Sequence, residues 1–273
     1  MDRVPILFIK EVLLQLEQPC HVKEIPQYPS TWGKVASRKV VRKPAELEVY
    51  YAANKEPVFF LRTSGPSSPL ALEDLEQFAL ESIAIRKKRY FDDIYTLPYP
   101  LTKANIQLLQ KHLQRGHPCR LLSVDVNGLP LLKQLCCLAP SRITHIYVKK
   151  NQPLPTEVLT QSVERGTLCH LNCAYSINMT QDTFMVLKKF VASKNFDSLI
   201  LTTFHGSLSE VTFIEGVVDA FLSRPRRQQF NFFASEHYEK LCGLLEEQAK
   251  QDKVDVYYSS AFLKLCPISF FTT

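Results

Sequence analysis

Hydrophobic residues follow a short pattern that recurs through the second half of this chain. In each copy the fourth and sixth positions are apolar. The copies start at Cys119, Ile143, Leu168, Phe196, Arg227 and Gln251, with spacings of 24, 25, 28, 31 and 24 residues, and a weaker copy starts at Phe91. A stretch long enough for a helix follows each copy. The pattern therefore predicts an α/β fold built from strand-helix units.

Units of one strand and one helix at this spacing are typical of leucine-rich-repeat solenoids. The alternative is a doubly wound α/β sheet, in which a glycine-rich turn meets a nucleotide phosphate. The chain has eight glycines and no Gly-x-Gly-x-x-Gly spacing. We predict a leucine-rich-repeat-like β/α solenoid with a small helical N-terminal block and a β-hairpin, and the closed α/β sheet remains the alternative.

The frame also predicts which residues share a position. Its fourth residues should form one apolar ladder on neighbouring parallel strands: Leu122, Ile146, Leu171, Leu199, Phe230 and Val254. The intervening helices should cover these strands with apolar faces such as Phe184, Leu187 and Val191. Ser207 and Glu210 have capping-box spacing at the start of one such helix. Gly166 follows another helix, at the position where a left-handed residue often ends it.

The first part of the chain has a different composition. Apolar residues recur at helical spacing from about Pro5 to Gln18, and a second short helix should include Trp32. Residues 46–62 alternate with period two around a turn, which predicts a hairpin, and Leu72, Leu75, Phe78 and Ala79 predict a helix after it. We therefore divide the chain into a helical block at residues 1–43 and a hairpin plus solenoid at residues 44–273.

Composition limits the classes of function. Lys and Arg exceed Asp and Glu by 33 to 27, and the basic clusters lack interleaved aromatic residues, so a nucleic-acid partner is disfavoured. The longest apolar stretches are shorter than the ~18 residues that a membrane span needs. Eight cysteines without a signal peptide favour free thiols in the cytoplasm or nucleus. No cofactor or metal is expected.

Catalytic motifs are absent from the sequence. It contains no Gly-x-Ser-x-Gly elbow, no His-Glu-x-x-His and no Cys-x-x-Cys. We therefore expect a protein that is not an enzyme. The alternative is an α/β hydrolase or transferase whose site carries no local motif.

The repeat pattern also predicts a candidate binding surface. Residues that alternate with the inward apolar positions should project from the concave side of the strands. The candidate binding residues on this side are Asp125, His145, Tyr147, Asn172, Asn231, Phe233 and Tyr257. Exposed aromatic residues are favoured at protein interfaces, although each could also serve as an ordinary strand residue. The row as a whole favours recognition of a protein substrate or partner.

The N-terminal phrase Met1-Asp2-Arg3-Val4-Pro5-Ile6-Leu7-Phe8-Ile9-Lys10-Glu11-Val12, followed by the Trp32 segment, resembles the opening of nematode F-box-like protein families. The resemblance implies a helical block that docks on the Skp adaptor of a cullin-type ubiquitin ligase, with a repeat domain that captures the substrate. It would assign the adaptor contact to Val4, Pro5, Phe8, Ile9, Val12 and Leu13. The alternative is that these helices cap the open end of the solenoid.

Overall fold

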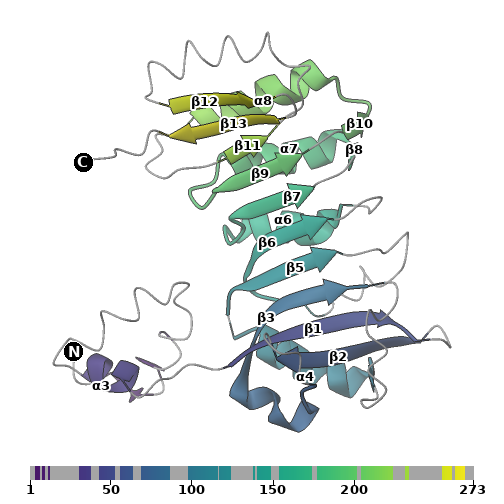
Figure 1. Ribbon diagram of the computed structural model, residues 1–273, viewed down its shortest axis with the longest axis vertical. Coiled ribbons are helices and arrows are strands. Elements are labelled where there is room, and N and C mark those ends of the chain that lie inside the picture. The colour runs from purple at the N-terminus through teal and green to yellow at the C-terminus, as the bar shows by residue number, and fades with distance from the viewer. Residues whose placement is uncertain are drawn as a thin grey trace.

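The structure is a computed structural model, shown in Figure 1. It describes residues 4–6, 8, 9, 12, 31–37, 43–52, 56–63, 69–86, 98–115, 117–123, 138, 140–148, 154–173, 177–201, 204–223, 231–233, 254–259 and 262–267.

The chain folds as a mixed α/β protein with a mostly parallel sheet. Among the described residues the main sheet has nine strands in the order β11-β9-β7-β6-β5-β3-β1-β2-β4. Their bounds are β1 Lys43–Tyr51, β2 Pro57–Thr63, β3 Phe78–Ile85, β4 Tyr99–Pro100, β5 Cys119–Ser123, β6 Ile143–Val148, β7 His170–Cys173, β9 Ser198–Leu201 and β11 Asn231–Phe233. All pairs from β1 through β3 to β11 are parallel, whereas β2 pairs antiparallel with β1 and β4.

Among the parallel strands β1, β3, β5, β6, β7, β9 and β11, the order in space follows the order in the chain, whereas β2 and β4 lie on the other side of β1. These parallel strands therefore lack the reversal of order at which doubly wound sheets bind their ligands. The hairpin predicted over residues 46–62 is confirmed as β1 and β2. The helix predicted at Leu72 is wrong beyond its first turn, because a 3₁₀ helix, η2 (Leu72–Gln77), leads directly into β3. The weak copy at Phe91 lies outside the described residues, except for its Tyr99.

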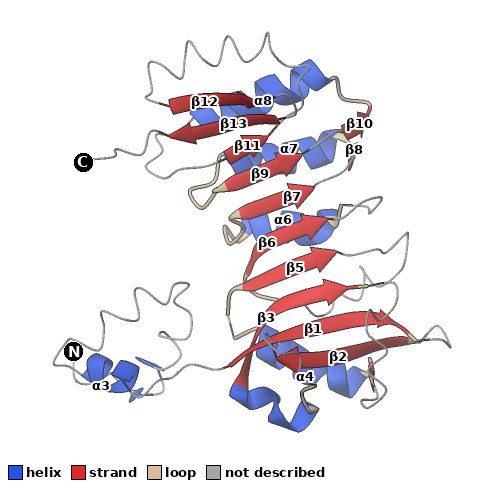
Figure 2. Ribbon diagram, in the orientation of Figure 1, coloured by secondary structure: helices blue, strands red, loops and turns tan. Residues whose placement is uncertain are grey.

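Four helices cover one side of the sheet, α4 (Lys103–Leu113), α6 (Thr156–Glu164), α7 (Gln181–Val191) and α8 (Glu210–Leu222), and they lie behind it in Figure 2. Their apolar faces are buried with the strands, as the spacing of Phe184, Leu187 and Val191 predicts. The side chain of Thr180 caps α7 by accepting from the Thr183 N–H at 3.2 Å. In α8 the capping residue is Ser209, which accepts from the Thr212 N–H at 3.1 Å, so the prediction of Ser207 is wrong.

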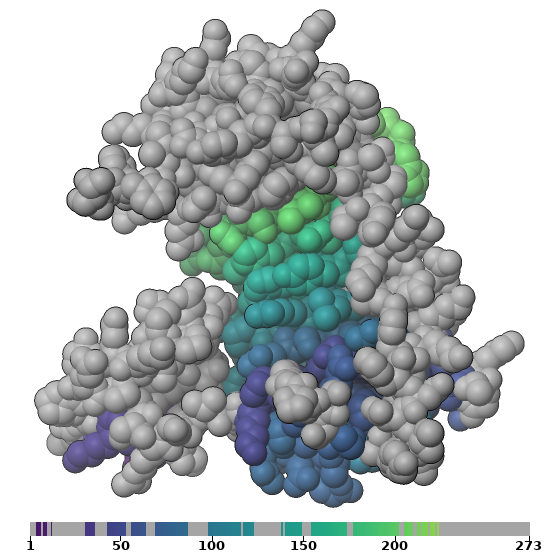
Figure 3. Space-filling view, viewed as in Figure 1, coloured from purple at the N-terminus to yellow at the C-terminus, as the bar shows by residue number. Residues whose placement is uncertain are grey.

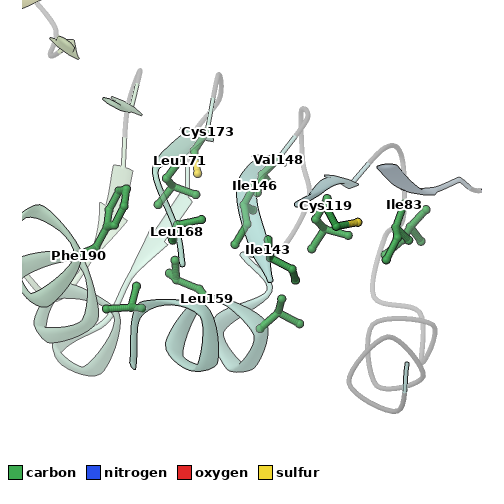
Figure 4. Packing of buried hydrophobic residues seen from close by; sticks show 14 of the residues in the cluster. Ile83, Cys119, Ile143, Ile146, Val148, Leu159, Leu168, Leu171, Cys173 and Phe190 are labelled. Carbon is green, nitrogen blue, oxygen red and sulfur yellow. The ribbon is translucent and has the colours of Figure 1, made fainter. Parts of the chain in front are cut away.

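An apolar ladder runs across the sheet beneath the helices. The strand registers place Leu47, Ile83, Leu121, Ile146, Leu171 and Leu199 side by side, and each is fully buried. Figure 4 shows part of this core around Ile146 and Leu171. Six fully buried aliphatic side chains on neighbouring strands fix the register, because a shift by one residue would turn them all to the other face.

The repeat frame predicts half of this ladder. Ile146, Leu171 and Leu199 stand as expected, but Leu121 replaces Leu122, because the register between β5 and β6 shifts at Cys119 and leaves Thr144 without a partner residue. Phe230 lies outside the described residues, and Phe232 stands opposite Leu199. The prediction for Val254 is wrong: it belongs to β12 (Val254–Ser259), which pairs antiparallel with β13 (Phe262–Pro267) in a separate sheet beside β11.

Two of the strand-helix units carry an additional short strand. β8 (Ile177–Met179) and β10 (Phe204–Gly206) follow β7 and β9 and pair in parallel. Gly206 has φ of 141°, and a Cβ there would collide with the carbonyl oxygen of Met179. Only glycine fits so close to the backbone of Met179, so the pairing of β8 with β10 depends on Gly206. Gly166, with φ of 65°, ends α6 in the left-handed conformation predicted for it.

The N-terminal block has a small core of its own. Ile9 and Val35 are buried against each other, with Val4 and Trp32 packed alongside. Trp32 belongs to α3 (Thr31–Ser37), which confirms the predicted second helix, and residues 6, 8, 9 and 12 are helical. Within the described residues this cluster shares no member with the core beneath the sheet, and α3 lies away from the strands in Figure 1.

Candidate functional site: the open face of the sheet

The side of the sheet opposite the helices carries two rows of side chains. The registers of β3, β5, β6, β7 and β9 place Ser82, Arg120, His145, His170 and Ser198 in the first row. The second row is Ala84, Leu122, Tyr147, Asn172 and Ile200. Paired strands lie ~4.8 Å apart, so the two rows form one continuous surface, which we call the open face. The teal atoms at the centre of Figure 3 belong to its strands.

Two histidines stack at the centre of the open face. His145 on β6 and His170 on β7 have ring centroids 4.1 Å apart and planes inclined by 21°. The ring of Tyr147 lies 6.0 Å from that of His145 and is inclined by only 16°. Near-parallel rings stacked across neighbouring strands stand upright on the sheet. Their edges, rather than their faces, therefore point away from it.

The inner nitrogen of each imidazole is held by a neighbouring group. Nδ1 of His145 lies 2.9 Å from the Thr144 hydroxyl. Nδ1 of His170 lies 2.8 Å from the Ser198 hydroxyl and 3.1 Å from Oδ2 of Asp197. A serine nucleophile activated by histidine needs the hydroxyl on one ring nitrogen and the carboxylate on the other. Because both groups contact the same nitrogen here, these two contacts orient His170 and do not have the arrangement of a serine-histidine-carboxylate triad.

The environment keeps His145 neutral. The pKa of its imidazole is lowered to about 4, mainly by burial and to a smaller extent by the neighbouring His170 and Arg120. At neutral pH the ring therefore offers one N–H donor and one acceptor. The lone pairs of two parallel rings do not converge on one point. No group of three or more His, Cys, Asp or Glu side chains among the described residues is arranged to hold a metal ion.

The same side of the sheet is closed at its β1-β2-β3 end. Arg62 contacts Glu46 at 2.7 Å and Glu48 at 3.1 Å, while Arg86 contacts Glu48 at 3.1 Å and Glu46 at 3.7 Å. The four side chains keep only 5–19% of their surface exposed. We call these four residues the charge network. Two cations and two anions compensate one another, so this end presents little net charge.

Apolar residues complete the closed end. Tyr50, Val58 and Phe60 project to the same side as the charge network and form a buried cluster with Ala52. Each keeps less than a tenth of its surface exposed. This cluster is separate from the core beneath the helices. The end of the sheet formed by β1 and β2 is thus buried on both sides.

The buried thiols are chemically quiet. Burial raises the pKa of both Cys119 and Cys173 to about 12, and the Glu81 carboxylate adds to the shift at Cys119. Thiolates are the reactive form of cysteine, so neither residue is suited to nucleophilic chemistry near neutral pH. Both act as small apolar side chains, as predicted for Cys173 from its inward position.

The structure brings together three of the predicted binding residues. His145, Tyr147 and Asn172 lie on the open face, and Tyr147 is directly opposite Asn172. The Cα atoms of Asn231 and Phe233 continue the two rows, opposite Ser198 and Ile200. Tyr257 does not join them, because it belongs to β12 in the separate two-stranded sheet. Asp125 lies outside the described residues.

The residues predicted to contact an adaptor divide into two groups. Ile9 is fully buried in the small core, with Val4 packed alongside it. Phe8 is 57% exposed and its neighbour Ile6 is 53% exposed. Pro5 is exposed and Val12 is partly buried, while Leu13 lies outside the described residues. Ile9 lies inside the block's own core and exposes none of its surface, whereas Phe8 and Ile6 are the residues of the block that offer apolar surface; the adaptor contact itself stays a prediction.

Sequence reasoning missed Arg120 and did not select His170. Arg120 escaped because the frame aligned Leu122 with Ile146, which gave β5 the wrong parity. The alternation of Cys119, Leu121 and Ser123 around Arg120 is the signal that could have found it. His170 carries the outward parity of the frame, but its contact with Asp197 and Ser198 becomes visible only in the folded chain.

No family model matches the sequence, and searches of the curated proteins and of the solved structures find no match. Among the described residues no helix is long and apolar enough to cross a membrane.

Proposed function

We propose that this chain is a non-catalytic recognition protein whose open face binds a protein partner. In this proposal the strand-helix units form a leucine-rich-repeat-like solenoid, and the open face is its concave surface. One observation carries the proposal: the parallel strands from β3 to β9 follow one another in space in their chain order, so that they align two rows of outward side chains without a described helix over them.

The composition of the open face supports recognition. Arg120, Tyr147 and the two histidines supply large side chains that combine donors with aromatic surface, and Tyr and Arg are enriched among the residues that dominate binding energy. All of them keep some exposure. The closed end offers a contrast within the same sheet, because its large side chains are already buried. A partner would therefore find free contact area at β5, β6 and β7.

The sharper proposal is a substrate receptor of a cullin-type ubiquitin ligase in the cytoplasm or nucleus. The N-terminal block would dock on the Skp adaptor while the open face holds the substrate. Two observations support docking over capping: the block has its own core, and Phe8 and Ile6 point more than half of their surface to solvent. A cap would be expected to bury its apolar residues against the sheet.

Co-purification of the Skp adaptor with the full chain tests this proposal. Phe8→Asp should abolish co-purification and leave thermal stability nearly unchanged, because the side chain is exposed. Met185→Asp is the matched control: Met185 is 46% exposed on α7, so its substitution adds the same charge away from the block and should leave co-purification intact. Failure of the wild-type chain to retain the adaptor would end the ubiquitin-ligase proposal.

A further inference from the structure

The first row of the open face contains a cation that forms no ion pair with the described residues, although the Glu81 carboxylate lies within electrostatic reach of it. Arg120 is exposed and makes no ion pair with any residue that the structure describes. By contrast, Arg62 and Arg86 on the same side of the sheet each contact two glutamates. An exposed arginine without an ion pair in the middle of a sheet can direct its planar set of N–H donors at a carboxylate of another molecule.

The neighbours of Arg120 in the first row can also donate hydrogen bonds to a carboxylate. His145 is its direct partner in the strand register, followed by His170 and Ser198. Nδ1 of His145 is engaged by Thr144, and its outer nitrogen, Nε2, makes no hydrogen bond with any described residue. Since burial lowers the pKa of this ring to about 4, it can donate to an acceptor without adding a positive charge of its own. The row therefore offers donors around one fixed cation.

Among the described residues of β3 to β9, carboxylates border this row on its amino-terminal side. Glu81 and Asp197 each stand one residue before the row; Asp197 is engaged by His170, and burial raises the pKa of Glu81 while the nearby Arg120 partly offsets that rise. On the other side lies the second row, with Leu122, Tyr147 and Ile200. The described carboxylates therefore leave the side of the second row open to the negative charge of a partner. Two residues along a strand span about 6.6 Å, which is also the spacing of alternate residues in an extended partner.

We propose that the open face binds an acidic segment of a protein partner, with a Glu or Asp carboxylate on Arg120 beside His145 and an apolar or aromatic side chain two residues away on the second row. This inference rests on the proposed function and specifies the chemistry of the partner. The inference is based on charge complementarity at Arg120 and not on the net charge of the chain, which is only +6 over 273 residues.

Three fluorescent twelve-residue peptides provide the probes, each with the sequence (Xaa-Ser-Tyr-Ser) repeated, where Xaa is Glu, Gln or Lys. Binding to the full chain is measured by fluorescence anisotropy at pH 7. The Glu peptide should bind about tenfold more tightly than the Gln peptide, and the Lys peptide more weakly than either. Arg120→Gln should remove most of the difference between the Glu and Gln peptides.

Lys189→Gln is the matched control, because Lys189 is exposed on α7, on the helical side of the sheet. It removes the same charge and should leave the affinities of all three peptides unchanged. Equal effects of the two substitutions would overturn the inference, since the Glu peptide would then respond only to net charge. A twelve-nucleotide RNA that binds more tightly than the Glu peptide, with the same loss in Arg120→Gln, would overturn it in favour of a nucleic-acid partner.

Tyr147→Ala separates this inference from the proposed function. If all three peptides bind equally and lose affinity in Tyr147→Ala, the open face recognises proteins but not acidic ones, and the inference alone fails. If neither Tyr147→Ala nor Arg120→Gln alters the binding of any peptide or of any protein recovered with the chain, the recognition surface lies elsewhere, and both fail.

Discussion

Two regions on the same side of the main sheet differ in how their charged side chains are paired. At the β1-β2-β3 end, Glu46 and Glu48 are compensated by Arg62 and Arg86, and the surrounding aromatic residues are buried. Around β5, β6 and β7 the sheet presents Arg120 without an ion pair among the described residues and a histidine pair with partly exposed rings. The ladder beneath runs through both regions, and β1 pairs in parallel with β3 at the closed end just as β5, β6 and β7 pair with one another.

This difference separates residues that stabilise the fold from residues that are available for binding. A buried charge without a partner costs several kcal/mol, so charges at the closed end have to be matched within the chain. An exposed arginine remains hydrated and costs little. Similar strands can therefore carry opposite roles on their outer side, and the following substitutions test that division.

The largest effect is expected from the ladder, which both regions share. Leu47→Ala beneath the closed end and Leu171→Ala beneath the open face should each lower the free energy of unfolding by roughly 2–5 kcal/mol through a core cavity. Chemical denaturation measures both. Leu122→Ala, the same change on the open face, should cost less than about 1 kcal/mol, because that side chain is only partly buried. Equal losses at Leu122 and Leu171 would mean that the open face is packed like the core.

The second-largest effect on the free energy of unfolding is expected from the charge network. Arg62→Met leaves Glu46 and Glu48 with Arg86 alone and should lower the free energy of unfolding by about 3 kcal/mol. Arg120→Met removes the same kind of side chain from the open face and should change it by less than about 0.5 kcal/mol. Thermal denaturation of the two variants gives the comparison. A large loss in Arg120→Met would contradict the distinction between the two regions.

A smaller effect is expected on binding. Tyr147→Ala should cost somewhat more than about 1 kcal/mol of affinity for a partner of the open face and leave the melting temperature nearly unchanged. Phe60→Ala at the closed end should do the reverse, because its ring is buried. Calorimetric titration and thermal denaturation of both variants measure the two quantities. Unfolding of Tyr147→Ala without loss of any interaction would make the open face structural.

The smallest effect is a dependence of stability on pH. The pKa of His145 is lowered to about 4 in the folded chain, whereas an unfolded imidazole titrates near 6.5. Between these values the unfolded chain binds more protons, so this stabilising contribution is complete above about pH 6.5 and declines as the pH falls towards 4. His145→Asn should reduce the difference in unfolding free energy between pH 7 and pH 5. Ring NMR of the wild-type chain should give the midpoint directly, and one near 6.5 would contradict the prediction.

Local patterns predicted the elements whose signal is contained in one stretch of chain. The hairpin follows from unbroken alternation around a turn, and the faces of α7 and α8 follow from helical spacing. β3 was missed because Leu72, Leu75 and Phe78 have helical spacing, and because the register shifts near Glu81, which interrupts the alternation that would indicate a strand. Bulges of this kind depend on the partner strand, which local periodicity does not contain.

The candidate site was predictable only where the frame held. Parity alone selected His145, Tyr147 and Asn172, because β6 and β7 keep the same register. It failed at Arg120, where the extra residue Thr144 in β6 displaces the alignment with β5. The charge network could not be predicted from either strand alone, since Arg86 meets Glu48 only when β3 pairs in parallel with β1.

Pairing of strands in chain order also bears on how the molecule folds. Leu121, Ile146, Leu171 and Leu199 meet across chain separations of 25, 25 and 28 residues, so each new pairing closes a loop of similar length and similar entropic cost. Folding can then spread from strand to strand without waiting for distant segments to meet. Strands in the middle of the sheet gain a neighbour on each side, whereas an edge strand gains one. Amide hydrogens of β6 and β7 should therefore exchange most slowly, with protection declining towards β11.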